Sequence, residues 1–275
     1  MSRSTLSVRW AAAALFALGL TGCPPSQDVK GGGVTLNLQS LPADPAELVK
    51  VADAQFDQGP AGLRNAQAVM EKALQSGEWA NSKAGFEGQW RLARAVAEQC
   101  GIDEGAACQA GLAGALAAAK KAVELDGTRV EGHYYLAQLY GFAAHQQRGG
   151  DIKPLLMQLQ SEGDAAIKAG ERFDSGGPAR MLGAIYAKAP APPVAIGDTE
   201  KGVQYLKRAV EIAPEHPQNH ILLAEAYIAD ERYQDAESEL KQAKTLLADP
   251  RWEKYRETWK AQLSTVERKL RAKQS

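Results

Sequence analysis

The chain contains few of the side chains that bind metals, with only three cysteines and four histidines in 275 residues. The nearest candidate ligands are Glu215, His216 and His220, which follow Pro214. A protein metal site needs three or four preorganised ligands, whereas this segment offers two imidazoles and one carboxylate. We therefore interpret the segment as a polar turn and helix start, and we expect neither a metal nor a cofactor.

Short motifs that carry catalysis are also lacking. The chain has no Gly-x-Ser-x-Gly sequence and no glycine-rich phosphate loop followed by Lys and Ser or Thr. The glycine triplet at residues 31–33 follows no strand, which a nucleotide-binding loop requires. Because no nucleophile, acid or base constellation is present, we predict that the protein is not an enzyme, and we set aside a cell-wall hydrolase.

The chain also lacks an excess or a cluster of charge of one sign. The formal net charge is −1, and no run of Lys or Arg forms a basic patch. Proteins that bind nucleic acids carry clustered basic residues. We therefore exclude nucleic acid as a partner.

Long hydrophobic runs are absent apart from residues 11–20, which follow Arg3 and Arg9. A membrane-spanning helix needs roughly 20 apolar residues, so this run is interpreted as the core of a leader peptide. The next residues, Leu-Thr-Gly-Cys at 20–23, resemble the lipobox of bacterial lipoproteins. That resemblance implies a signal peptide over residues 1–22 and a lipid, including palmitate, on Cys23. An ordinary leader with a coincidental cysteine is the alternative.

The position after Cys23 is Pro24 rather than Asp. In bacterial lipoproteins this difference favours the outer membrane over the inner one. The resemblance therefore implies a lipid-anchored protein at the periplasmic face of the outer membrane, with acyl chains as the anchor.

Once Cys23 carries lipid, Cys100 and Cys108 remain as an even pair. The periplasm is oxidising, and disulfides form in such compartments. We predict a disulfide between these two residues; two unpaired thiols are the alternative.

A 34-residue repeat is visible in the carboxy-terminal part of the chain. Small and apolar residues recur at this distance, in the pairs Gly202 and Ala236, Leu206 and Leu240, and Ala209 and Ala243. This is the period of tetratricopeptide (TPR) repeats, which are stacked helical hairpins. The expected fold class is all-α: a TPR-like α-solenoid of about five antiparallel helix pairs with a carboxy-terminal capping helix.

Composition divides the mature chain into three parts. Residues 23–44 contain the Cys and a flexible tether rich in glycine and proline, although a short strand at residues 34–38 is an alternative. Asp44 and Pro45 form a good helix start, and the repeat domain covers residues 45–248. Residues 249–275 form the predicted cap, in which apolar residues make one stripe; a partner-binding coiled coil is the alternative.

Two turns of the array are longer than the repeat requires. Residues 142–151 and residues 188–198 lengthen the third and fourth pairs. Insertions in a solenoid project from one side of the stack, often beside the binding surface. Pro190 and Pro193 stiffen the second turn, and Asp198 can cap the following helix, so these three are loop candidates for binding.

The irregular turns carry a further resemblance. Residues 173–186, 188–190 and 196–198, together with the earlier segment 129–137, resemble the T-component family of TRAP transporters over roughly residues 115–245. The resemblance implies a periplasmic TPR lipoprotein without enzymatic activity. It further implies docking of an extracytoplasmic solute-binding protein, a cavity for a small organic ligand, and a homo-oligomer such as a trimer.

Candidate binding residues follow from TPR positions that line the concave groove of the first helices. These positions hold Tyr134, Gln138, Arg180, Ala184, Ile221 and Glu225, of which the polar four, Tyr134, Gln138, Arg180 and Glu225, are the candidates. The Arg180 guanidinium suits a carboxylate ligand, but an ion pair with Glu131 or another acid is the alternative. Tyr134 is either a ligand contact or a packing residue.

The function predicted from these features is a lipid-anchored periplasmic adaptor that binds a periplasmic or membrane protein partner. A small organic acid near Arg180 is a further candidate ligand. The alternative is a scaffold lipoprotein that helps an outer-membrane machine to assemble.

Overall fold

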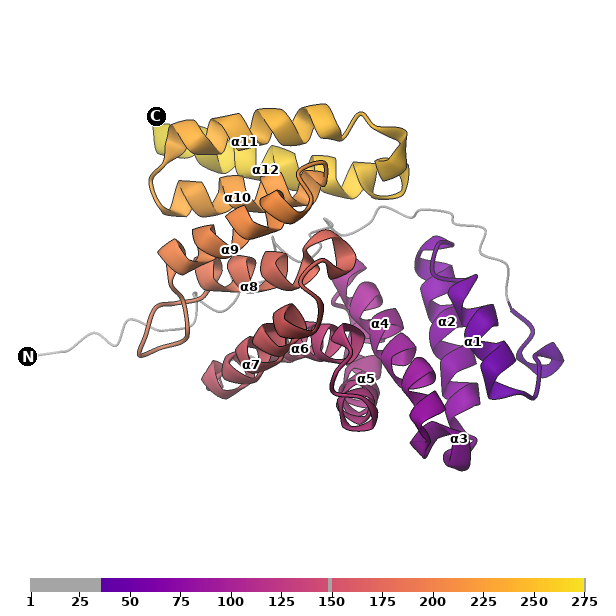
Figure 1. Cartoon of the computed structure of the whole chain (residues 1–275). Helices are drawn as coiled ribbons and strands as arrows, with labels where there is room; N and C mark the ends of the chain where they lie inside the picture. Colours follow the sequence, from indigo (N-terminus) through magenta and orange to yellow (C-terminus); the bar gives the residue numbers. More distant parts are fainter. Residues whose placement is uncertain (1–35, 148–149, 275) are drawn as a thin grey trace, which may run out of the picture. The chain divides into compact units, whose positions relative to one another are not determined.

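The structure, a computed structural model, describes residues 36–147 and 150–274 (Figure 1). No strand occurs in these two ranges, so the predicted all-α class is confirmed. Leader, Cys23 and most of the tether lie outside the described residues. The α-helices are, in chain order, α1 (Pro45–Asp53), α2 (Gly59–Leu74), α3 (Gly77–Asn81), α4 (Phe86–Ile102), α5 (Ala106–Leu125), α6 (Val130–Gln146), α7 (Lys153–Gly170), α8 (Gly177–Lys188), α9 (Thr199–Ile212), α10 (Pro217–Ala229), α11 (Tyr233–Leu246) and α12 (Arg256–Gln274).

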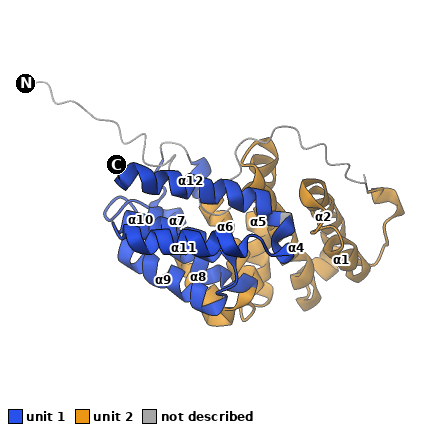
Figure 2. Ribbon diagram, turned by 90° about the horizontal axis from the view of Figure 1, so that it is seen from above, with its two compact units in different colours: residues 1–22, 143–157, 174–275 blue, residues 23–142, 158–173 orange. Residues whose placement is uncertain are grey.

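The described chain divides into two compact units (Figure 2). Unit 2, orange in the figure, contains residues 36–142 and 158–173. Unit 1, blue, contains residues 143–147, 150–157 and 174–274. The division falls within α6 and α7, and each unit has its own hydrophobic core.

In unit 2, consecutive helices pack as the predicted hairpins, α1 on α2 and α4 on α5, with α4 also against α2. The core of unit 2 includes Leu48, Ala52, Ala66 and Met70, all almost fully buried. Asp44 caps α1 as expected, because its side chain accepts a hydrogen bond from the Ala46 amide at 3.0 Å.

In unit 1, α8 packs on α9, α10 on α11, and α12 on both α10 and α11. The repeated small residues explain the close approach of α8 and α9. A Cβ atom at Gly183 would lie 2.6 Å from Leu206, and one at Gly202 would lie 2.7 Å from the Ala187 amide nitrogen. Ala209 and Ala243 are fully buried, so the 34-residue echo marks core positions.

Three details of the helices differ from the expectation. The stretch 142–146 continues α6 and is not a turn, because its buried residues Phe142 and Ala144 extend the apolar face. The tail begins with a 3-10 helix, Pro250–Tyr255, before α12 continues the stripe with the buried Trp259 and Leu263. The short helix α3 was not foreseen.

Candidate binding surface

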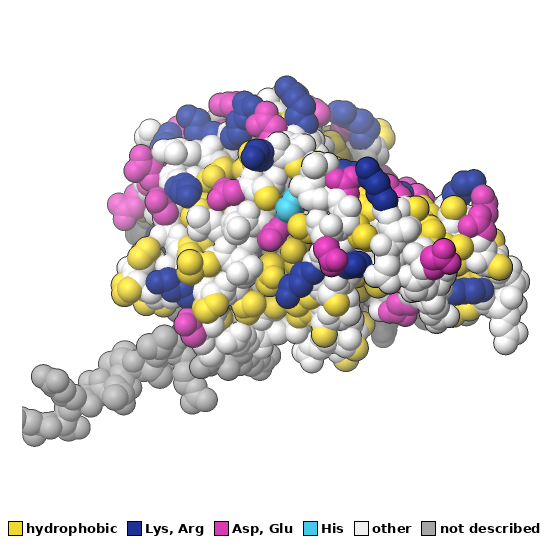
Figure 3. All heavy atoms as spheres, turned by 60° about the horizontal axis from the view of Figure 1, so that its bottom comes forward, with side chains coloured by type: hydrophobic (Ala, Val, Ile, Leu, Met, Phe, Trp, Pro, Cys, Tyr) yellow, Lys and Arg dark blue, Asp and Glu magenta, His cyan; other side chains and the backbone are white. Residues whose placement is uncertain are grey.

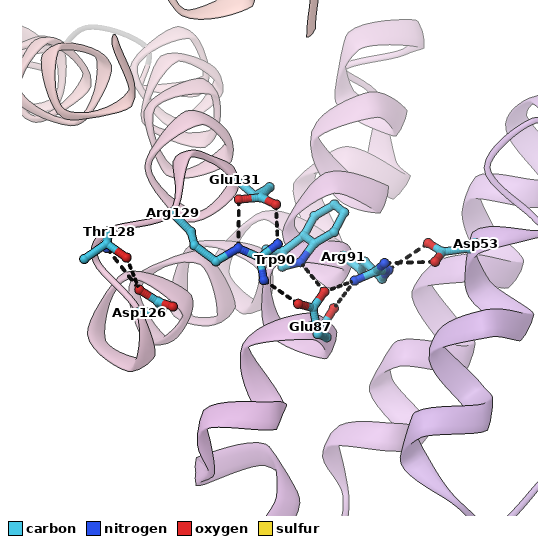
Figure 4. A network of polar contacts seen from close by, with 8 residues as sticks. All are labelled: Asp53, Glu87, Trp90, Arg91, Asp126, Thr128, Arg129 and Glu131. Atoms are coloured by element: carbon cyan, nitrogen blue, oxygen red, sulfur yellow. Dashed lines mark hydrogen bonds and ion pairs between the residues drawn. The ribbon is translucent and has the colours of Figure 1, made fainter. Parts of the chain in front are cut away.

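The first helices of unit 2 carry a continuous chain of ion pairs, called here the charge network: Asp53, Glu87, Arg91, Arg129 and Glu131 (Figure 4). Arg91 binds Asp53 with two hydrogen bonds, of 2.7 and 2.9 Å, and Glu87 with one of 2.5 Å. Arg129 then joins Glu87 to Glu131. The network thus ties the end of α1 to α4 and to the start of α6.

Every charged group in this network is paired with a neighbour of opposite sign, with three carboxylates sharing two guanidinium groups. Burial opposes ionisation of Glu87, but hydrogen bonds from Arg129 and Arg91 prevail and lower its pKa. Trp90 adds an indole hydrogen bond to the same carboxylate at 3.0 Å. The network is therefore a satisfied structural clamp rather than a set of charges awaiting a ligand.

The predicted groove residues of α6 behave as packing residues. Tyr134 is only 4% exposed, and its ring packs edge-on against Tyr135 and Phe173, with centroids 5.2 and 5.3 Å apart. Gln138 is half-buried. The structure thus places Tyr134 inside unit 2, as its packing alternative proposed.

Two histidines hold the starts of α6 and α10 in the same way. His133 lies between the Glu162 carboxylate, at 2.6 Å, and the Gly127 carbonyl, at 3.0 Å. His220 lies between Glu239, at 2.6 Å, and the Pro214 carbonyl, at 2.7 Å. Since both ring nitrogens face oxygen acceptors, only the imidazolium can donate both hydrogen bonds.

The pKa values agree with this geometry. The hydrogen bond to Glu162 is the largest influence on His133 and raises its pKa against the effect of burial. Burial is the largest influence on His220, but Glu239 and the Pro214 carbonyl outweigh it, so its pKa is raised too. We call these two arrangements the imidazole clamps.

The Arg180 side chain is hydrogen-bonded to the turn that precedes α8. Its guanidinium donates to the carbonyl oxygens of Asp174 and Ser175, at 3.1 and 3.3 Å, and to Asn219 at 3.0 Å, and it pairs with the Asp174 carboxylate at 2.5 Å. Asp174 and Ser175 have φ angles of 48° and 54°, in the left-handed region that non-glycine residues rarely adopt.

Arg180 therefore holds a strained turn before α8 and is only 6% exposed. The partner foreseen for it, Glu131, pairs with Arg129 instead. The geometry favours the structural alternative for Arg180 over a carboxylate ligand.

Glu225 is the groove candidate that lies beside open space. Its carboxylate is held between Lys188 of α8, at 2.7 Å, and Lys269 of α12, at 2.6 Å. Burial opposes its ionisation, but the two ammonium groups prevail and lower the pKa of Glu225. Three helices separated in sequence thus meet at one carboxylate.

A hollow of about 250 Å³ opens at this carboxylate, and we call it the lysine hollow. Alanines at four positions give it room, while charged side chains surround them. Its lining is Ala184, Ala187, Lys188, Leu222, Glu225, Ala226, Ile228, Ala229, Glu231, Lys269 and Lys273.

The α8–α9 loop has a fixed base and an exposed tip. Gly197 donates to the Pro190 carbonyl and Asp198 to the Tyr186 carbonyl, each at 2.8 Å. The Asp198 side chain accepts from the Lys201 amide and so caps α9. The tip, residues 191–194, is exposed and includes Pro193, whose carbonyl accepts from Lys153 at 3.4 Å.

His216 is a packing residue. Its ring packs against Trp252 and Trp259, with centroids 4.9 and 5.1 Å away. Burial, with a smaller contribution from Arg180, lowers its pKa to about 2, so it stays neutral at physiological pH. Within the described ranges no group of three or more His, Cys, Asp or Glu residues is placed to hold a metal ion.

Cys100 at the end of α4 and Cys108 at the start of α5 are joined by a disulfide with an S–S distance of 2.06 Å. The bridge ties the two helices of this pair together at their connecting turn. No helix in the described part of the chain has the length and apolarity to span a bilayer.

The surface charge is mixed. Figure 3 shows one face of the molecule, on which acidic, basic and hydrophobic side chains are interspersed. No field of one sign covers this face.

Comparison with known proteins agrees with the helical pairs. Residues 194–256 match the family model of the tetratricopeptide repeat. A solved structure of a thermophilic TPR protein from Thermus thermophilus is similar, with a TM-score of 0.60 over 81% of this chain and 98% of that one. The fold is of the tetratricopeptide type. The identity of 18% makes this a likeness of fold alone, and no curated protein matches the chain in sequence.

The tetratricopeptide-type fold supports a role in protein–protein interaction and hence a protein partner. Within unit 1 the stacked first helices α8 and α10, followed by α12, present the lysine hollow. Sequence reasoning identified Glu225 there but missed both lysines, because nothing in the sequence links α8 to α12.

Proposed function

We propose that this protein is a lipid-anchored periplasmic adaptor that binds a partner protein through the first-helix face of unit 1. The observation that supports the binding role is the lysine hollow, which α8, α10 and α12 line with charged groups around small side chains. The two other groove candidates whose surroundings are described above, Tyr134 and Arg180, are buried and occupied. The hollow is thus a place where unit 1 can accept a side chain from outside.

The partner that the resemblance to T-components suggests is an extracytoplasmic solute-binding protein of a TRAP system. Binding rather than catalysis fits His133, His220 and His216, whose ring contacts are structural. By the same resemblance, the proposed assembly is a homo-oligomer such as a trimer, which light scattering on the purified mature protein measures directly.

A capture experiment from periplasmic extract tests the partner. Native protein, Lys269→Glu and Lys260→Glu serve as baits, and mass spectrometry identifies what each one retains. Lys260 is the matched control, because it lies on the same helix and pairs with the exposed Glu257 outside the hollow. We expect the solute-binding protein on the native and Lys260→Glu baits and much less on Lys269→Glu.

Two outcomes contradict the proposal. Equal recovery of the solute-binding protein by all three baits removes the hollow from the interface. Recovery of components of an outer-membrane assembly machine instead replaces the transporter role with the scaffold role.

The anchor is proposed from residues 20–23, and palmitate labelling in cells tests it. Native protein should incorporate label and sediment with outer membranes, whereas Cys23→Ala should do neither. Label in both forms contradicts lipidation at Cys23, and native protein found in the inner membrane contradicts the proposed location.

A further inference from the structure

The lysine hollow carries more positive than negative charge. Lys188, Lys269 and Lys273 line it, against Glu225 and Glu231. Glu225 is shared between Lys188 and Lys269, so a single carboxylate serves two ammonium groups. When all five groups are ionised, the lining carries one more positive than negative charge, in a recess where desolvation strengthens electrostatic attraction.

Burial lowers the pKa of Lys188, since the attraction of the shared Glu225 does not compensate for desolvation. Its side chain is 12% exposed, whereas that of Lys269 is 41% exposed. A second anion entering from the Lys269 side would favour the charged form of both lysines. A cation would instead meet two ammonium groups around the one buried carboxylate.

The residues that line the hollow limit the size and chemistry of the group that carries the anion. Ala184, Ala187, Ala226 and Ala229 leave the space, and Leu222 and Ile228 add apolar surface beside the charged groups. A hollow of about 250 Å³ is below the usual size of drug-sized ligand sites, which begin at roughly 300 Å³. The space suits a short aliphatic chain that ends in one compact charged group.

We propose that the lysine hollow is a binding site for a carboxylate on a short aliphatic chain, with Lys269 and Lys273 as its first contacts and Glu225 holding Lys188 and Lys269 in place. This site rests on the proposed adaptor function and specifies its chemistry. The carboxylate has two sources: a free organic acid, or an acidic side chain of a bound partner.

Titration calorimetry on the purified mature chain tests the site without any partner protein. Butyrate is the free-acid probe, a short glutamate-rich peptide is the side-chain probe, and butyramide is the uncharged control. Native protein should bind at least one of the two carboxylate probes and should not bind butyramide. A free acid as the source predicts binding of butyrate alone, and a partner side chain predicts tighter binding of the peptide.

Lys269→Gln should weaken binding about tenfold or more, the effect of losing one charge-assisted hydrogen bond, whereas Lys260→Gln should leave it unchanged. Lys273→Gln gives a second reading at an exposed position that should not affect folding. Unchanged affinity in both Lys269→Gln and Lys273→Gln, or no binding of either carboxylate by native protein, overturns the site. The adaptor function is then still judged separately by the capture experiment.

Discussion

The first-helix faces of the two units are both charged, but their ion pairs are arranged differently. In unit 2 the charge network alternates acid and base, so each group has a partner of opposite sign. In unit 1 one buried carboxylate serves two lysines beside an open hollow. The unit 2 face is therefore stabilised by a continuous chain of ion pairs, whereas the unit 1 face places one shared carboxylate beside a hollow.

Removal of the unit 1 carboxylate should have the largest effect. Glu225→Ala leaves Lys188 buried with its charge uncompensated, and we expect a loss of about 3–5 kcal/mol of unfolding free energy. Denaturant unfolding followed by circular dichroism measures it. The double variant Glu225→Leu/Lys188→Met should recover most of this loss; if it is as unstable as Glu225→Ala, the cause is packing rather than an unpaired charge.

Loss of the disulfide in unit 2 should come next. The bridge closes a short loop, with a sequence separation of 8, so replacing Cys100 and Cys108 by Ser should cost about 2–3 kcal/mol by the chain-entropy estimate. Thermal unfolding of native and double-variant protein, each without reductant, gives the difference. Ser275→Ala is the control for differences in preparation between variants. Equal melting temperatures of the native protein and the variant without Cys100 and Cys108 would contradict the expectation.

Removal of Arg91 from the charge network should lower the unfolding free energy less than removal of Glu225 from the hollow. Arg91 is mostly buried, but its partners Asp53 and Glu87 are about 44% and 37% exposed and can be solvated. Arg91→Ala should therefore cost about 1–2 kcal/mol, with part of the loss from packing of its stem. A loss as large as that of Glu225→Ala, measured by the same denaturant unfolding, would remove the distinction between the two faces.

The imidazole clamps should give a small pH dependence in each unit. The folded pKa values of His133 and His220 are raised above the unfolded value of roughly 6.5. Their stabilisation is thus fully present below that value and is lost as pH rises through the folded pKa. We expect a decrease of about 1 kcal/mol per clamp on going to alkaline pH.

Hydrogen exchange at several pH values can assign this decrease to each unit. His133→Gln should flatten the pH dependence in unit 2 alone, and His220→Gln in unit 1 alone. His145, which lies in neither clamp, offers the matched control, and a slope that persists in both clamp variants contradicts the assignment.

Periodicity in the sequence was sufficient to predict most of the helices and the buried core positions. Buried small residues such as Ala209 and Ala243 recur at a fixed distance because two helices approach closely there. The ends of helices were harder: residues 142–146 remain helical since Phe142 and Ala144 are buried, which a turn-like composition did not indicate.

The candidate site was predicted only in part, because its contacts join distant segments. Glu225 follows from its place after the core Leu223, whereas Lys188 and Lys269 come from helices that the sequence does not pair. Arg180 was misleading, since the left-handed backbone at Asp174 that requires it is not visible in the residue types. The clamps did leave a signal: His133 and His220 both stand three residues before a core leucine.

The α8–α9 loop has a base whose residue types are restricted by close contacts and a tip whose residue types are less restricted. Its base admits no side chain at Gly197, where a Cβ would lie 1.8 Å from the Ala189 carbonyl oxygen. The tip, residues 191–194, is exposed, and the chain returns to the buried core at Ala195. New residues at the tip would therefore be displayed in the same place by the same frame, so recognition could be rewritten there without redesigning the repeat.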